Sequence, residues 1–300
     1  NQNINITANV PNSLDLNYHR VLGGSFDGAV SYMVGNIDDF RIYNYVLPPL
    51  EVYDLYNGNS DRSYPILKDA NNVIINPTAW YKFDNSTNLG LDSSGNNYNA
   101  TNSTVPVQFT NTNYIRGNGS ALFTASSIVA NMTYLSGINL NLNNKSFSIA
   151  FWSRVTSIPS GSNYRLWFGY TSGGTSARTV LHIGYSSSTA VFFDFWNDAT
   201  YYTQTNNNDL NIWIHWCFTY NITGNVRLIY KNGILVQTGS SGGPLNASGG
   251  SYIIGHRFPT SDAGMNFDGN MDDFRIYDFV LDATQIQNIY SNARIVNVYS

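Results

Sequence analysis

The feature that most constrains the fold is a nine-residue segment that occurs twice in the chain. Gly35–Tyr43 and Gly269–Tyr277 are identical at eight of nine positions, and the ninth exchanges one apolar residue for another. The match continues without a gap to Tyr56 in the first copy and Tyr290 in the second. An offset of 234 residues is too long for a solenoid unit. It fits a repeated domain of about 200 residues.

The chain contains only the end of the earlier copy, followed by the whole of the later copy. The repeat therefore predicts a partial domain followed by a complete one. Residues 1–60 are expected to be the C-terminal part of an upstream copy, and residues 61–76 a linker or docking strand. Residues 77–294 would form one complete copy, and 295–300 a tail. A 60-residue sheet fragment would leave half of its core exposed, so we expect it to pack on the complete domain, on a neighbouring chain or on upstream sequence. Because the chain begins without Met, we also expect a processed product or a piece of a longer protein.

Composition excludes several classes of protein. Of the 300 residues, 42% are hydrophobic, 15% aromatic and only 11% charged, which argues against disorder. The net charge of −4 leaves no basic surface for a phosphate backbone, so no nucleic-acid partner is expected. No run of about 20 apolar residues occurs, so no membrane span is expected. The single cysteine, Cys217, excludes an internal disulfide framework.

The acidic residues are unusual, because 18 of the 19 are Asp and the only Glu is Glu51. Most glycosidases use two positioned carboxylates, and commonly at least one is Glu. Hydrolase chemistry is therefore disfavoured, although an Asp pair such as Asp194 and Asp198 remains an alternative. The 42 Asn residues supply much of the polarity that charged side chains usually provide.

The hydrophobic pattern predicts β-strands. Ser146–Trp152 alternates with period two, which is typical of a strand with one buried face. Val226–Tyr230 and Ile234–Val236 flank Asn232-Gly233, which predicts a hairpin with a type I′ turn. Further apolar strands are expected at 180–185, 190–196, 213–220 and 274–277, separated by clusters of Gly, Asn and Ser.

One helix is predicted near the end of each copy. Asp282 as N-cap and Gln285 three residues later form a capping-box pattern, and Leu281 can pack onto Ile286. Leu47–Tyr56 is the matching stretch in the earlier copy. Many strands with one terminal helix predict an all-β fold, a two-sheet antiparallel jelly-roll sandwich with one short C-terminal helix per copy.

The order of these segments resembles a known family, the laminin-G-like branch of the concanavalin A-like lectin/glucanase superfamily. The segments that carry the resemblance are Ala79–Asp84, Asp92–Asn96, Phe147–Trp152, Trp213–Tyr220, Tyr230–Gly233 and Phe267–Tyr277. The resemblance implies the jelly roll, which hosts lectins, adhesion modules and glycosidases alike. Glycosidase members carry a Glu-x-Asp-x-x-Glu strand, and the complete copy contains no Glu. The resemblance therefore implies a binding or structural module.

The resemblance also implies one calcium ion, held between a loop and a late acidic strand. Asp92, Asn97 and Asp272 are the candidate ligands, because Ca²⁺ takes carboxylate and amide oxygens. In the alternative interpretation, Asp92 only makes an Asx turn, and Asp273 either pairs with Arg275 or caps the strand edge.

A carbohydrate site is predicted where aromatic and amide side chains gather at a strand end. The candidate residues are Arg178, Trp196, Asn197, Tyr201 and Tyr202, with Tyr164 on a nearby segment. Aromatic rings stack on the apolar faces of sugars, and Asn or Arg can bond the hydroxyl groups. The alternative is that some of the chain's 44 aromatic residues lie at loop edges by default.

Nine Asn-x-Ser/Thr sequons form a third group of candidates. Their acceptors are Asn5, Asn85, Asn99, Asn102, Asn118, Asn131, Asn144, Asn221 and Asn246. The motif marks a surface acceptor in a secreted protein, although an Asn-rich chain also produces several by chance. The four histidines show no metal spacing, and His215 is expected to be a core residue with its hydrogen bonds satisfied. Cys217 on the same strand is expected to be a small buried hydrophobe.

These observations predict a non-enzymatic, surface-displayed module for carbohydrate recognition or adhesion. It would belong to a multi-copy extracellular, cell-surface or virion-surface protein, such as a fibre, spike or capsid-associated protein. The expected partner is a glycan or a neighbouring protein subunit. One alternative is a purely structural assembly module of a capsid or surface layer, and another is a hydrolase that uses Asp pairs.

Overall fold

A computed structural model describes the following ranges: 64–69, 73–127, 132–158, 164–170, 176–187, 189–204, 209–247, 249–257 and 265–291. The predicted upstream copy at 1–60, the tail at 295–300, and the sequons at Asn5 and Asn131 lie outside the described residues.

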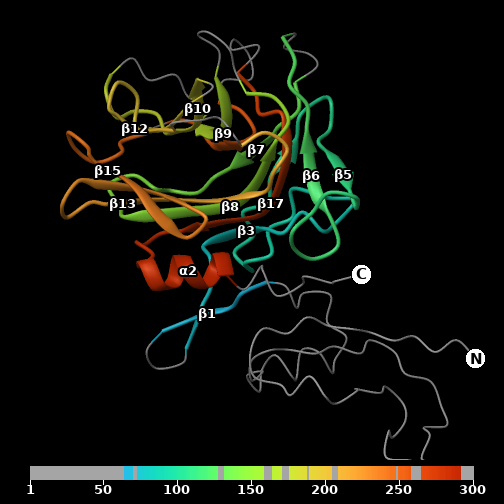
Figure 1. The fold of residues 1–300 in the computed structure, drawn as a ribbon, viewed down its shortest axis with the longest axis horizontal. Coiled ribbons are helices and arrows are strands. Elements are labelled where there is room, and N and C mark those ends of the chain that lie inside the picture. Colours follow the sequence, from blue (N-terminus) through green and yellow to red (C-terminus); the bar gives the residue numbers. More distant parts are fainter. Residues whose placement is uncertain are drawn as a thin grey trace, which may run out of the picture. The chain divides into compact units, whose positions relative to one another are not determined.

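Two stacked sheets make up most of the described residues, as predicted (Figure 1). The seven-stranded sheet has the order β12 (Ala199–Thr203), β11 (Ala190–Asp194), β10 (His182–Ser187), β9 (Arg165–Tyr170), β16 (Tyr252–Ile254), β7 (Leu135–Ile138) and β4 (Thr101–Asn102). The eight-stranded sheet has the order β15 (Ile234–Ser240), β14 (Val226–Lys231), β13 (Ile214–Asn221), β8 (Phe147–Val155), β17 (Gly269–Tyr277), β6 (Ser120–Phe123) and β5 (Gln108–Thr110).

The remaining elements are attached to the eight-stranded sheet. Strand β3 (Ala79–Tyr81) is the eighth strand of this sheet and pairs with β17, and β1 (Leu67–Lys68) and β2 (Ile74–Ile75) form a separate two-stranded ribbon. Helix α2 (Ala283–Ser291) lies on the side of this sheet that faces away from the seven-stranded sheet (Figure 1). Within the described ranges, no helix has the length and apolar character needed to cross a bilayer.

The core between the sheets is aromatic, and it follows from the alternation in the sequence. Phe147, Ile149 and Phe151 of β8 point inward, and the Phe151 ring stacks on Phe274 of β17 at 5.0 Å. The opposite face of the same sheet packs under helix α2 in a second cluster. That cluster comprises Leu67, Ala150, Cys217, Tyr230, Tyr277, Leu281, Ile286 and Ile289. Cys217 is therefore a small buried hydrophobe, as predicted, and burial raises the pKa of its thiol.

The predicted local motifs are present. Asn232 and Gly233 have φ angles of 52° and 77°, which the type I′ hairpin turn requires. At the start of α2, the Gln285 amide N–H donates to Asp282 Oδ1 at 2.8 Å, and the Asp282 amide N–H donates to Gln285 Oε1 at 2.9 Å. Leu281 and Ile286 are buried in the same cluster. The capping box and the apolar contact behind it are thus confirmed.

The repeated nonapeptide of the second copy is strand β17, and all nine of its residues are buried. Gly269 has a φ angle of 141°, and a Cβ atom at this position would collide with the carbonyl oxygen of Arg154. The Asn270 side-chain amide donates to Ser120 Oγ at 3.2 Å. The chain bulges between Asp272 and Arg275, where Asp273 takes a positive φ of 50°. Close packing and buried polar contacts therefore explain the residue types of this nonapeptide.

The stretch predicted as a linker or docking strand contacts the domain in the part that is described. The Tyr64 hydroxyl donates to Asp84 Oδ2 at 2.8 Å, and Arg275 Nη1 donates to the Pro65 carbonyl at 2.8 Å. Leu67 is buried in the cluster beneath helix α2. Residues 64–69 therefore pack on the sheet that they precede.

Candidate functional site

A hollow of about 440 Å³ opens on the outer face of the seven-stranded sheet, at its β12 end. Its lining comprises Tyr164, Leu166, His182, Phe192, Asp194, Trp196, Asn197, Ala199, Tyr201 and Arg257. Strands β9 to β12 and the turn between β11 and β12 supply most of these side chains.

Strand alternation and register bring the floor of the hollow together. His182 on β10 is the direct neighbour of Asp194 on β11. Phe192 is the direct neighbour of Tyr201 on β12. The intervening residue Phe193 points into the core between the sheets. Residues two apart on a strand share a face, so the polar and aromatic groups collect outside the sandwich.

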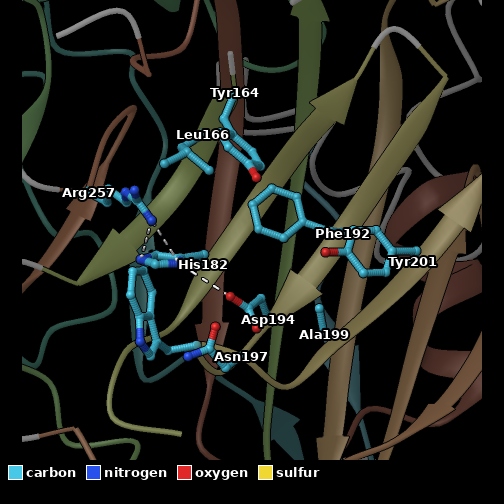
Figure 2. Close-up of a pocket in the computed structure, with 10 residues that line it drawn as sticks. Tyr164, Leu166, His182, Phe192, Asp194, Asn197, Ala199, Tyr201 and Arg257 are labelled. Atoms are coloured by element: carbon cyan, nitrogen blue, oxygen red, sulfur yellow. Dashed lines mark hydrogen bonds and ion pairs between the residues drawn. The ribbon is translucent and has the colours of Figure 1, made fainter. Parts of the chain in front are cut away.

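One wall of the hollow is aromatic. Figure 2 shows Tyr164, Phe192 and Tyr201 in a row along one side. The Tyr164 and Phe192 rings lie 5.5 Å apart, and the Tyr201 ring stacks on Phe192 at 6.2 Å with an interplanar angle of 22°. Phe192 is buried, whereas Tyr201 is 51% exposed. Tyr201 therefore offers an open ring surface that a buried ring supports from below.

The other wall is polar, and it carries Arg257, His182, Asp194 and Asn197 (Figure 2). His182 Nδ1 lies 3.5 Å from Asp194 Oδ2 and 3.4 Å from Arg257 Nη1. The Arg257 guanidinium also lies 5.5 Å above the Trp196 ring, and His182 packs edge-on against that ring. The Trp196 ring therefore contacts two groups of the polar wall, the Arg257 guanidinium and the His182 imidazole.

The turn between β11 and β12 has an unusual backbone. Trp196 and Asn197 have φ angles of 61° and 54°, and the Phe195 amide N–H donates to the Asp198 carbonyl at 3.1 Å. The two successive positive φ angles are those that a type I′ turn uses, formed here without glycine, and the Asp198 amide N–H donates to Asp194 Oδ1 at 3.1 Å. A bulky residue such as Trp is uncommon at positive φ. The turn directs Trp196 and Asn197 to the hollow.

Of the residues predicted to bind sugar, the structure brings Trp196, Asn197 and Tyr201 to the hollow, together with Tyr164. It places the other two elsewhere. Tyr202 alternates to the inner face and packs edge-on against Trp216 at 6.4 Å. Arg178 pairs with Asp198 at 3.8 Å and does not line the hollow.

The analysis of the sequence missed His182, Phe192, Asp194 and Arg257 in this site. Alternation places Phe192 and Asp194 on one strand face, but the sequence does not give the pairing register that adds His182. Arg257 follows β16, which pairs with β9 and lies three strands from β11 in the sheet. No local pattern connects these segments, so only the tertiary fold brings them together.

The residues predicted for calcium do not fit a cation site. Asp92 Oδ1 accepts the amide N–H groups of Trp80 and Ser94, each at 2.9 Å. Its Oδ2 accepts the Ser94 hydroxyl at 2.8 Å and the Tyr98 amide N–H at 2.9 Å. Four donors therefore surround this carboxylate, which forms an Asx-type turn, and no lone pair is directed at a metal ion.

The other two predicted ligands have different surroundings, and Asp272 Oδ1 has no hydrogen-bond partner among the described residues. Asp272 is fully buried, and its Oδ2 accepts the amide N–H groups of Ile115 and Arg116, both at 2.8 Å. Asn97 lies on an exposed loop with a φ angle of 62°. Among the residues that the structure describes, no three His, Cys, Asp or Glu side chains are arranged to hold a metal ion. Calcium binding remains a prediction that this geometry does not support.

Asp273 belongs to a buried ionic cluster under the sheet. Its carboxylate pairs with Arg275 at 2.7 Å and with Arg116 at 3.3 Å, and it accepts the Trp80 indole N–H at 2.8 Å. Burial by itself raises the pKa of Asp273, but the two guanidinium groups outweigh it and lower the pKa below the usual value. This is the pairing that the alternative interpretation predicted.

His215 differs from expectation in one respect. It is buried, as predicted, but neither ring nitrogen has a hydrogen-bond partner among the described residues. The ring lies against Trp152 and Tyr290, with centroids 5.2 and 6.0 Å away. Burial lowers the pKa of His215 to about 3, and the positive charge of Arg116 contributes in the same direction. The imidazole is therefore neutral in the folded protein at neutral pH.

The described sequon asparagines are all exposed. They are Asn85, Asn99, Asn102, Asn118, Asn144, Asn221 and Asn246. Several side-chain oxygens accept local backbone N–H groups, such as Thr223 N–H on Asn221 at 3.0 Å and Asp92 N–H on Asn99 at 2.8 Å. Glycosylation remains a prediction for these positions.

Comparison with known proteins identifies the family. A sequence profile of the concanavalin A-like lectin/glucanases superfamily matches residues 129–287. A search of curated proteins finds no match. Domain 4 of AbnA, an extracellular GH43 arabinanase from Geobacillus stearothermophilus solved with arabinotriose, is similar at 16% identity and a TM-score of 0.53. The match covers 72% of this chain and 98% of that one.

The binding domain of botulinum neurotoxin serotype G is also similar, at 17% identity and a TM-score of 0.50. The match covers 72% of this chain and 50% of the toxin domain, so the chain spans about half of that structure. At these identities, the two neighbours bear on the fold alone. The sequence profile covers more than half of the chain, so this chain belongs to the concanavalin A-like lectin/glucanase superfamily.

Proposed function

We propose that this chain is a non-catalytic carbohydrate-binding module whose binding site is the hollow on the seven-stranded sheet. The observation that carries the proposal is the opposition of an aromatic wall, Tyr164 to Tyr201, to a polar wall that includes Asp194 and Arg257. Binding sites combine apolar or aromatic lining with a few placed polar groups.

Saccharides match both walls. A pyranose or furanose ring has an apolar face of C–H groups, which stacks on an open aromatic ring such as that of Tyr201. Its hydroxyl groups both donate and accept, so they pair with the carboxylate of Asp194, the amide of Asn197 and the guanidinium of Arg257. The fold neighbours support the proposal, because one was solved with arabinotriose and another is a toxin binding domain.

The proposed activity is binding without cleavage. A glycosidase needs two carboxyl groups that flank the scissile bond. Asp194 is the acidic residue that lines the hollow, whereas the Asp198 carboxylate is held by Arg227, Ser241 and the Gly242 amide. Asp194 and Asp198, the alternative pair for hydrolysis, therefore do not line the same hollow.

We further propose display outside a cell or on a virion, in a protein that carries more than one copy. The repeated nonapeptide supports several copies in one chain. The exposed sequon asparagines and the low content of charged residues support an extracellular or virion surface.

A glycan array followed by calorimetry tests the binding proposal. Tyr201→Ala removes the open ring and should weaken binding at least about tenfold, which is about 1.4 kcal/mol. Tyr201→Phe keeps the ring and should bind like the wild type. Tyr114→Ala, which removes another exposed tyrosine, is the control for general surface effects. If the wild-type protein binds no glycan, or Tyr201→Ala binds as well as Tyr201→Phe, the proposed site is wrong.

A second candidate function is subunit assembly. Ile234 and Leu235 at the start of the edge strand β15 are 66% and 47% exposed. An apolar edge strand is a template for pairing with another chain. Ile234→Lys should then dissociate an oligomer seen by sedimentation, whereas a wild-type protein that is monomeric at all concentrations argues against assembly through this edge.

A further inference from the structure

We propose that Asp198 and Arg227 form a cross-sheet tie that positions the polar wall of the hollow. Neither residue lines the hollow. The inference rests on the proposed function, because it assigns two positioning residues to the same binding site.

The tie joins the two sheets. Asp198 ends the turn between β11 and β12 of the seven-stranded sheet, whereas Arg227 lies in β14 of the eight-stranded sheet. Asp198 Oδ1 lies 3.2 Å from the guanidinium of Arg227, which is fully buried. Asp198 Oδ2 accepts the Ser241 hydroxyl at 2.8 Å and the Gly242 amide N–H at 2.9 Å. Both carboxylate oxygens are therefore anchored on the opposite sheet.

The same guanidinium also holds the first residue of the turn. The Arg227 Cζ atom lies 4.1 Å from the centre of the Phe195 ring, in a cation–π contact. Phe195 and Asp198 are the two outer residues of the turn. One buried arginine thus contacts both ends of a four-residue turn.

The turn needs these contacts because the backbone of its central residue Trp196 is strained. A bulky residue at positive φ is unfavourable and persists only where the surrounding structure fixes it. Trp196 is that residue, and the Arg178 amide N–H donates to its carbonyl at 3.1 Å as a further contact. Arg178 therefore contacts the turn through its backbone as well as through its ion pair with Asp198.

Release of the turn would disturb the polar wall, since Asn197 is its other central residue. Trp196 also carries the Arg257 guanidinium on its ring and His182 at its edge. Burial works to raise the pKa of Asp198, but the Ser241 hydrogen bond and Arg227 lower it overall. The carboxylate therefore stays ionised at neutral pH and keeps its hold on Arg227.

The test compares two buried ion pairs in the same sandwich. Asp198→Asn weakens the tie, and Asp209→Asn weakens a comparable pair with Lys231, 2.6 Å apart, which does not reach the turn. Well below both melting temperatures, Asp198→Asn should lose about tenfold in glycan affinity and Asp209→Asn should keep wild-type affinity. Equal losses in both variants would overturn the proposal, because they would indicate a purely structural effect.

A second measurement does not depend on glycan binding. Fluorine NMR of the protein labelled with 5-fluorotryptophan reports on Trp196, and Trp196→Phe assigns its resonance. Asp198→Asn should shift or broaden this resonance, and Asp209→Asn should leave it unchanged. An unchanged resonance in Asp198→Asn overturns the tie even if the wild type binds glycan. A wild type that binds no glycan refutes the proposed function, while the NMR comparison still decides the positioning role.

A milder variant covers the case in which Asp198→Asn does not fold. Ser241→Ala removes the hydrogen bond to Asp198 Oδ2 and the acceptor for Arg227 Nη2, and it keeps the ion pair between Asp198 and Arg227. A smaller change of the Trp196 resonance in the same direction supports the tie. Wild-type spectra together with wild-type affinity in Ser241→Ala contradict it.

Discussion

Two consecutive aspartates of β17 have opposite electrostatic surroundings. Burial raises the pKa of Asp272 well above its usual range, although two backbone N–H groups donate to its Oδ2. The pKa of Asp273 is instead lowered by Arg275 and Arg116, against the effect of burial. The negative charge of Asp273 therefore stabilises the buried ionic cluster. A negative charge on Asp272 would instead destabilise the folded protein.

Substitution by asparagine should separate these roles. Asp273→Asn leaves two buried guanidinium groups without their counter-charge and should lower the free energy of unfolding by about 3–5 kcal/mol. Asp272→Asn keeps an amide oxygen for the Ile115 and Arg116 N–H groups and should change it by less than about 1 kcal/mol. Urea unfolding at neutral pH measures both, and similar losses in the two variants would contradict this account.

His215 predicts a pH dependence at the same scale. Its pKa is about 3 in the folded protein, whereas an unfolded histidine titrates near 6.5. The unfolded state therefore binds a proton that the folded state does not, and stability should fall as the pH drops from about 6.5 towards 3. The slope approaches about 1.4 kcal/mol per pH unit in the middle of that window.

His215→Phe is the control, since it keeps an aromatic ring between Trp152 and Tyr290. Urea unfolding between pH 7 and pH 4.5 should show a much smaller slope in this variant. Below about pH 4, both proteins should lose stability as carboxylates with lowered pKa values, such as Asp273, become protonated. An unchanged slope above pH 4.5 would show that the His215 ring is solvated or bonded in solution.

At the scale of elements, two turns with positive φ angles at both central residues differ in whether the sequence predicts them. Asn232-Gly233 carries the residues that a type I′ turn favours, and they predict the hairpin. Trp196-Asn197 takes positive φ angles without that signal, because contacts from the opposite sheet fix it. Local chemistry predicts the first turn, and only tertiary structure explains the second.

The capping box of helix α2 supplies a prediction at this scale. Asp282→Ala removes the acceptor for the Gln285 amide N–H and should cost about 1 kcal/mol. Asp282→Asn keeps an acceptor at the N-cap and should stay within a few tenths of the wild type. Thermal unfolding compares the two, and equal melting temperatures for both variants would show that the cap contributes nothing.

For the whole molecule, the strongest sequence signal and the proposed site are in different places. The nonapeptide of β17 is buried throughout, so its repetition predicts a repeated fold and says little about function. The sandwich, the core face of β8, the hairpin and the helix all followed from local periodicity and turn residues. The hollow was only half predicted, because His182, Asp194 and Arg257 meet through strand register and sheet order.

The segment before β3 has a consequence for how such a module can be isolated. A fragment that begins at residue 77 loses Tyr64 and Leu67 and removes the Pro65 carbonyl from Arg275. A fragment that begins at residue 64 keeps these contacts and should melt several degrees higher in calorimetry. Equal melting temperatures would show that the segment is dispensable. Anyone who shortens this chain should therefore treat residues 64–69 as the first part of the domain that follows them.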